Sequence, residues 1–176
     1  MKEPSLRYSD ERDKAYGIAG MAITLVACDD EDILSEINLD AEPGECVVTS
    51  TDYGLKCNPR ISAKILWTQS VKDLRSNTFM ALGNLACRRY VLSHQSLTAH
   101  DTHDIREAVR TEAFEQCSLD KDEADNIFNN CLNQVDRVFR HSGVQNIVHT
   151  FVTKLSERRT MTATEVIELL AQLGLR

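Results

Sequence analysis

The sequence contains little of what breaks or constrains a chain. Its 176 residues include only 7 glycines and 3 prolines, too few for a collagen-like or low-complexity protein. Aromatic residues make up 6% of the chain, with a single tryptophan. Hydrophobic residues reach 42%, which excludes a disordered chain. This length and composition predict one compact domain spanning residues 1–176.

The familiar motifs of catalysis and metal binding are also absent. The sequence has no GxSxG elbow, no HExxH pattern and no glycine-rich phosphate loop. None of its six cysteines stands in a CxxC pair, so a zinc finger or a thioredoxin-like redox site is not expected. No apolar run reaches the roughly 20 residues that cross a bilayer. We therefore expect a soluble cytoplasmic protein with reduced, buried thiols and no membrane span.

One apolar run leaves a different location open. Residues 17–28 end in Leu25–Cys28, which resembles the lipobox of a bacterial lipoprotein signal, with Cys28 as the lipidated residue. Such a signal requires a basic leader, but here acidic and basic side chains cancel. The apolar residues also recur at helical spacing behind a cap at Ser9 or Asp10. A buried helix is the main prediction, and an envelope lipoprotein anchored at Cys28 is an alternative.

Helical periodicity dominates the chain after residue 60. Ser62 can cap a long segment that reaches about His94, and its broad apolar face, which includes Trp67, predicts a central helix wrapped by others. Asp120 and Glu123 have the spacing of a capping box ahead of another apolar stripe. The patterns together predict an all-α, bundle-like domain of about five to seven helices.

A stretch rich in turn residues interrupts the helical pattern at residues 41–60. It contains Pro43-Gly44, and Cys46–Thr49 can form a short strand, although no other segment offers an obvious partner. We expect N-terminal helices in residues 1–40, a connector with a short extended segment in 41–60, and the helical core in 61–176.

Charge alternates along the chain. Residues 1–60 and 101–136 each carry a net charge of −7, whereas residues 61–100 and 137–159 each carry +4. Blocks of this kind predict acidic and basic helices that face one another, within the fold or across a symmetric interface. The overall charge of −7 and the few aromatic residues argue against a nucleic-acid-binding protein.

The main cluster of potential metal ligands consists of His94, His100, His103 and Asp104. Imidazole and carboxylate groups at such spacing can hold a divalent metal, whose bound water is a nucleophile near neutral pH. His103-Asp104 also resembles the His-Asp pair of the all-α HD phosphohydrolases, and that resemblance implies a metal-dependent hydrolase. The other interpretation is a solvated loop in which Thr102 or a neighbour caps the following helix.

A second candidate site is a place for a small anion. Arg137, Arg140 and His141 lie at the end of one predicted helix, and Gly143 begins the next. Free N–H groups at the start of a helix, together with these cations, can bind an anion, although the same cations also suit a helix C-terminus.

The function predicted from these patterns is association. With no catalytic motif, complementary charge blocks and several amphipathic helices, the chain has the look of a bacterial, non-catalytic protein that binds a protein partner or forms a homo-oligomer. We expect no cofactor. The alternatives are the hydrolase built on His94, His100, His103 and Asp104, and the lipoprotein anchored at Cys28.

Overall fold

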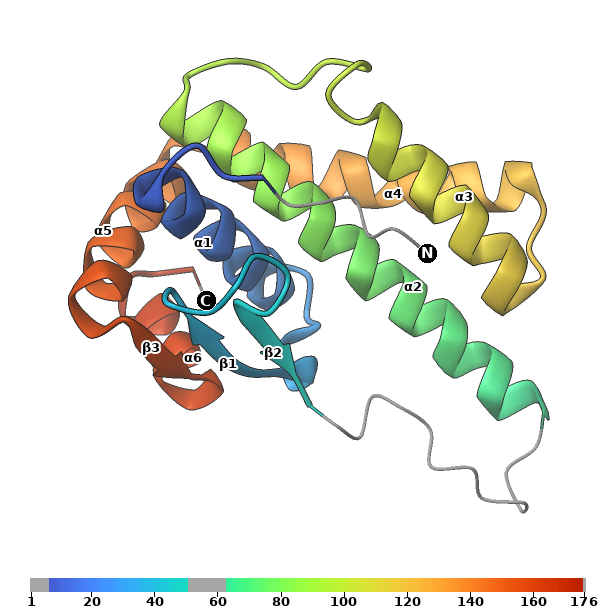
Figure 1. The fold of residues 1–176 in the computed structure, drawn as a ribbon, viewed down its shortest axis with the longest axis horizontal. Helices are drawn as coiled ribbons and strands as arrows, with labels where there is room; N and C mark the ends of the chain where they lie inside the picture. The colour runs from blue at the N-terminus through green and yellow to red at the C-terminus, as the bar shows by residue number, and fades with distance from the viewer. Residues whose placement is uncertain (1–6, 51–62, 176) are drawn as a thin grey trace.

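The computed structural model describes residues 7–50 and 63–175, and it confirms the all-α prediction (Figure 1). Two groups of helices lie on either side of the long helix α2: α3 and α4 on one side, and α1, α5, α6 and a small sheet on the other. The α-helices of the described residues are α1 (Glu11–Ala27), α2 (Ala63–Ala86), α3 (His103–Cys117), α4 (Lys121–Arg140), α5 (Ser142–Arg158) and α6 (Ala163–Gln172).

The helix that is buried on all sides is α1. Every residue from Ala15 to Val26 is buried, because this stretch carries no charge and can accept neighbours around its whole circumference. Asp10 caps its start by accepting a hydrogen bond from the backbone N–H of Asp13 at 2.7 Å. The apolar run at residues 17–28 is therefore the buried helix that its periodicity predicts.

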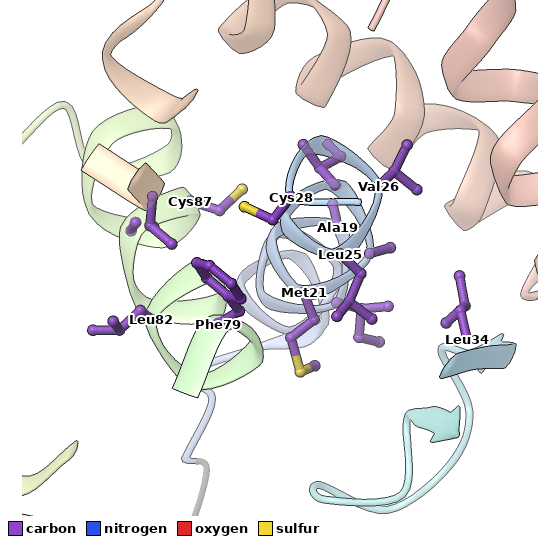
Figure 2. Packing of buried hydrophobic residues seen from close by; sticks show 14 of the residues in the cluster. Ala19, Met21, Leu25, Val26, Cys28, Leu34, Phe79, Leu82 and Cys87 are labelled. Carbon is purple, nitrogen blue, oxygen red and sulfur yellow. The ribbon is translucent and has the colours of Figure 1, made fainter. Parts of the chain in front are cut away.

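The expectation of a single central helix after Ser62 needs correction. α2 does pack against α1, α3 and α4, but it exposes residues such as Arg75 and Asn77, so α1 and α2 share the centre of the fold. Figure 2 shows Met21 and Leu25 of α1 and Phe79 of α2 within the same buried cluster.

A three-stranded antiparallel sheet lies beside these helices, in the order β2-β1-β3. Its strands are β1 (Leu34–Asn38), β2 (Val47–Thr49) and β3 (Thr160–Thr162). The extended segment expected near Cys46–Thr49 is present as β2, but the expectation that it lacks a partner is wrong: β1 pairs with it and also with β3. Ile37 lies at the centre of the sheet, opposite both Val47 and Met161.

Two helices in the second half of the chain, α4 and α6, begin with capping boxes. Asp120 and Glu123 cap α4 reciprocally, as their spacing predicts, and Thr162 and Glu165 do the same for α6. The apolar stripe of α4 is buried at Phe128 and Phe139, and its residues Ile127, Leu132 and Val138 are partly buried. Amphipathic helices thus turn their apolar faces inward within the described part of the chain.

α2 continues into a π-helix, η3 (Cys87–Leu92), from which two side chains reach different helices. Arg88 donates hydrogen bonds to both carboxylate oxygens of Asp13 on α1, and Tyr90 donates to Asp136 on α4. The π-helix therefore ties α2 to both halves of the molecule.

Candidate interaction surface

The last turn of α3 meets the first turns of α2 at one end of the molecule, at the lower right of Figure 1. Trp67 of α2 donates its indole N–H to the carbonyl oxygen of Cys117 at 2.8 Å. This carbonyl belongs to the end of a helix, where no intrahelical donor remains. The hydrogen bond fixes the indole ring at the C-terminus of α3, although the ring itself is 49% exposed.

Phe114 lies one turn before Cys117 on the same helix and is 73% exposed. The buried residues of α3 are Val109, Ala113 and Cys117. Phe114 is not among them and lies on the solvent-exposed side of the helix. Trp67, Phe114 and the β2 residue Val48 are the exposed large hydrophobic residues of the described part of the chain. Trp67 and Phe114 both belong to the end of the molecule where α3 ends against the start of α2, and we call these two exposed residues the aromatic surface.

Carboxylates lie near the aromatic surface, together with two exposed lysines, Lys64 in the first turn of α2 and Lys121 at the start of α4. Burial raises the pKa of the Cys117 thiol, and the negative charges of Glu112 and Asp73 raise it further. The exposed Glu115 and the exposed Asp122 add charge of the same sign in the last turn of α3 and the first turn of α4. The carboxylates outnumber the two lysines, so a molecule that docks here meets apolar residues with an excess of negative charge around them.

Acidic and basic blocks of the sequence form ion pairs with one another inside the fold. Arg88 pairs with Asp13, Arg89 with Asp101, and Arg159 with both Glu11 and Asp40. These pairs join basic blocks of the sequence to acidic ones within a single chain. Because of them, the charge blocks themselves give little support to a symmetric interface, and the aromatic surface becomes the main argument for association.

The predicted metal ligands are all exposed and lie around the start of α3. His94 follows the π-helix in a left-handed conformation, His100 lies in the loop, and His103 and Asp104 open α3. Nowhere in residues 7–50 and 63–175 do three His, Cys, Asp or Glu side chains gather in a way that could hold a metal ion. Thr102 is at the N-cap position, but its hydroxyl bonds back to Thr98 and Ala99 and makes no cap.

The residues predicted to bind an anion, Arg137, Arg140 and His141, have different surroundings in the structure. Arg140 pairs with Asp136 at 2.8 Å and lies over the ring of Tyr90. His141 caps α5, since its Nδ1 accepts the N–H of Gly143 at 3.2 Å and so takes one of the donors that an anion would use. Arg137 is exposed and forms no ion pair with a described residue. Two of the three side chains therefore already have partners within the described structure, and the anion site stays a prediction.

Cys28 is the C-cap of α1 and is only 9% exposed. Burial raises the pKa of its thiol to about 11. Cleavage before this residue, as in a lipoprotein, would remove α1 and with it the helix around which the core is built. None of the described helices is long and apolar enough to cross a membrane.

Sequence reasoning missed Phe114 and misjudged Trp67. It assigned Trp67 to the apolar stripe of a central helix, whereas the residue is 49% exposed in the structure. For Phe114 a signal was present: it is a single aromatic residue between Glu112 and Glu115, away from the stripe of Val109 and Ala113. No protein-family model matches the chain, and no curated protein is significantly similar to it.

Proposed function

We propose that this protein is a non-catalytic module that binds another protein chain, and that the partner docks on the aromatic surface. The observation that carries the proposal is the 73% exposure of Phe114, one turn before the Cys117 carbonyl oxygen that holds the exposed Trp67 in place. Aromatic side chains are enriched among the residues that dominate binding energy at protein interfaces. A ring held by a hydrogen bond also loses little conformational freedom on docking.

The charge around the aromatic surface favours a partner with basic side chains over a second copy of this chain. In a two-fold symmetric contact the same patch meets itself, so the carboxylates of Glu112, Glu115 and Asp122 would face their own copies. Like charges across an interface cost affinity, whereas Lys or Arg beside an apolar anchor would complement this surface. The partner we propose is therefore a chain that presents apolar and basic residues together.

The test compares two exposed hydrophobic residues from different parts of the surface. Phe114→Gln removes the proposed anchor, and Val48→Thr changes an exposed residue of β2 that lies outside the aromatic surface. Each variant, tagged at its C-terminus, is recovered from the native host at low salt, and copurifying chains are quantified by mass spectrometry. We expect a stoichiometric partner with wild type and Val48→Thr, and its loss with Phe114→Gln.

Sedimentation across a range of concentrations separates the two kinds of partner. If the chain self-associates and Phe114→Gln abolishes that association, the partner is a second copy of this chain and not a basic protein. A chain that stays monomeric and brings no stoichiometric partner, or a partner retained by Phe114→Gln, would contradict the proposal. Binding to a basic partner should also weaken as salt is raised, because screening shortens the reach of the carboxylates to about 8 Å at physiological ionic strength.

A further inference from the structure

An open pocket of about 550 Å³ lies between the start of α1 and the middle of α5, away from the aromatic surface. This volume is within the range of small-molecule sites in proteins, about 300–1,000 Å³. Val152, which is only 8% exposed, contributes an apolar patch to it. The polar residues that line it are Arg12, Tyr16, His149, Thr153, Ser156 and Glu157.

The imidazole of His149 is held in place by a buried tyrosine. The Tyr16 hydroxyl lies 2.7 Å from His149 Nδ1, and the two rings meet edge to face with centroids 5.8 Å apart. Tyr16 is only 4% exposed, so its ring is fixed by the core. When this hydroxyl donates to Nδ1, the neutral imidazole carries its proton on Nε2, which leaves Nε2 as a donor for a ligand.

Arg12 is a cation without an anionic partner in the described structure. Its guanidinium lies over the Tyr16 ring, 5.8 Å from the ring centroid, and forms no ion pair with a described Asp or Glu. Other arginines of the molecule, such as Arg88, Arg110 and Arg159, are each paired with carboxylates. Arg137 also forms no ion pair with a described residue, but Arg12 in addition lines a pocket, where its guanidinium can meet a ligand.

Further hydrogen-bonding groups face the same space. The Ser156 hydroxyl makes no hydrogen bond to a described residue, so it can donate to a ligand. Glu157 carries the opposite charge, but it pairs with Lys154 at 2.9 Å, which offsets part of its repulsion toward an anion. The pocket thus combines a guanidinium, an imidazole and a hydroxyl with one partly neutralised carboxylate.

We propose that this pocket binds a small organic anion through a carboxylate or phosphate group. Arg12 supplies the counter-charge, and His149 Nε2 and Ser156 supply hydrogen bonds, while Val152 contacts the apolar part of the ligand. Guanidinium groups suit both kinds of anion because their fork of N–H donors matches two oxygens at once. The pocket is separate from the aromatic surface, so this inference does not depend on the proposed protein partner.

The experiment titrates isotope-labelled protein with inorganic phosphate and, separately, with succinate, at constant ionic strength maintained with chloride. Backbone amide shifts are followed by NMR. We expect saturable shifts confined to the start of α1 and to α5, with a dissociation constant on the order of 1 mM for the preferred probe. Comparison of the two probes decides between a phosphate and a carboxylate.

Four variants separate the pocket from non-specific ion binding. Arg12→Gln should weaken binding by about tenfold or more, since it removes the charge-assisted bonds. Lys121→Gln, which alters an exposed cation of α4 outside the pocket, should leave binding unchanged. Glu157→Gln should tighten binding, and Tyr16→Phe, which keeps the ring but frees His149, should weaken it.

Two results would overturn the proposal. One is the absence of saturable shifts around α1 and α5 with both probes. The other is equal affinity for wild type and Arg12→Gln, with thermal unfolding confirming that the variant is folded. Because Arg12 is exposed, its substitution should leave the fold intact, so a loss of binding in that variant reports on the site.

Discussion

A Cβ atom on Gly20 would lie 2.2 Å from the carbonyl oxygen of Gly83, so α1 and α2 touch at their backbones. The relationship is mutual: a Cβ on Gly83 would lie 2.2 Å from the Thr24 hydroxyl oxygen and 2.6 Å from the carbonyl oxygen of Gly20. No side chain fits between the two helices at this point. Two glycines in the interior of helices, where glycine normally weakens a helix, are explained by this contact.

We predict that Gly83→Ala destabilises the protein by about 3 kcal/mol, because an added methyl group must push two backbones apart. Gly143→Ala is the matched control, since a Cβ there meets only the His141 ring at 3.1 Å. Its effect should stay within about 0.5 kcal/mol. Urea unfolding of the three proteins measures the difference, and equal midpoints would show that the helices can separate at little cost.

The ion pair between Asp13 and Arg88 should make stability depend on pH in the acid range. Burial raises the pKa of the Asp13 carboxyl, but hydrogen bonds from Arg88 and from Ser9 outweigh burial, and the pKa lies below its ordinary value. Folding therefore favours the ionised form. The resulting stability is present above the unfolded pKa of about 3.9 and is lost as pH falls through the lower, folded value.

Asp13→Asn should cost about 2 kcal/mol near neutral pH, since it removes hydrogen bonds to a charged group. It should also flatten the fall in stability below about pH 4. Asp104→Asn, at an exposed position with no ion pair to a described residue, is the control. Denaturant unfolding at several pH values gives the dependence of the unfolding free energy on pH for each protein. The same dependence for Asp13→Asn and wild type would show that the Asp13 carboxylate does not cause the loss of stability in acid.

The described cysteines should be unreactive in the folded protein. Burial raises the pKa of Cys131 to about 12 and that of Cys28 to about 11, and it raises the pKa of Cys87 well above its ordinary range. A thiol that stays protonated is a poor nucleophile. We test this in a Cys57→Ser background, because Cys57 lies outside the described residues. The five remaining thiols should react with Ellman's reagent at about pH 8 only after unfolding. Rapid reaction of the native protein would contradict the prediction.

The hydrolase alternative makes a clear prediction about metal. If His94, His100, His103 and Asp104 held a divalent ion, purified protein would contain about one metal per chain, and His100→Ala with His103→Ala would remove it. Because these side chains are exposed and are not gathered around one point, we expect no stoichiometric metal. We also expect that added zinc leaves the thermal unfolding of wild type and of the double variant alike.

Features that depend on short stretches of sequence could be predicted. The caps at Asp10, Asp120 and Thr162 follow from residues within one turn of each helix, and the apolar stripe of α4 follows from its period. The strand at Val47–Thr49 could also be predicted, but β1 could not, because its five residues follow an apolar helix and alternate too briefly to be distinguished from a turn.

The candidate sites were decided by distant contacts. Tyr16 and His149 are 133 residues apart, and Trp67 is 50 residues from the carbonyl that fixes it, so no local pattern links either pair. A sequence states which residues of a helix are apolar, but it does not state which of them the neighbouring helices cover. The helices of this protein were therefore determined by local hydrogen bonding and periodicity. Its exposed aromatic surface and its pocket were decided only when the tertiary structure left Phe114 uncovered and brought α1 against α5.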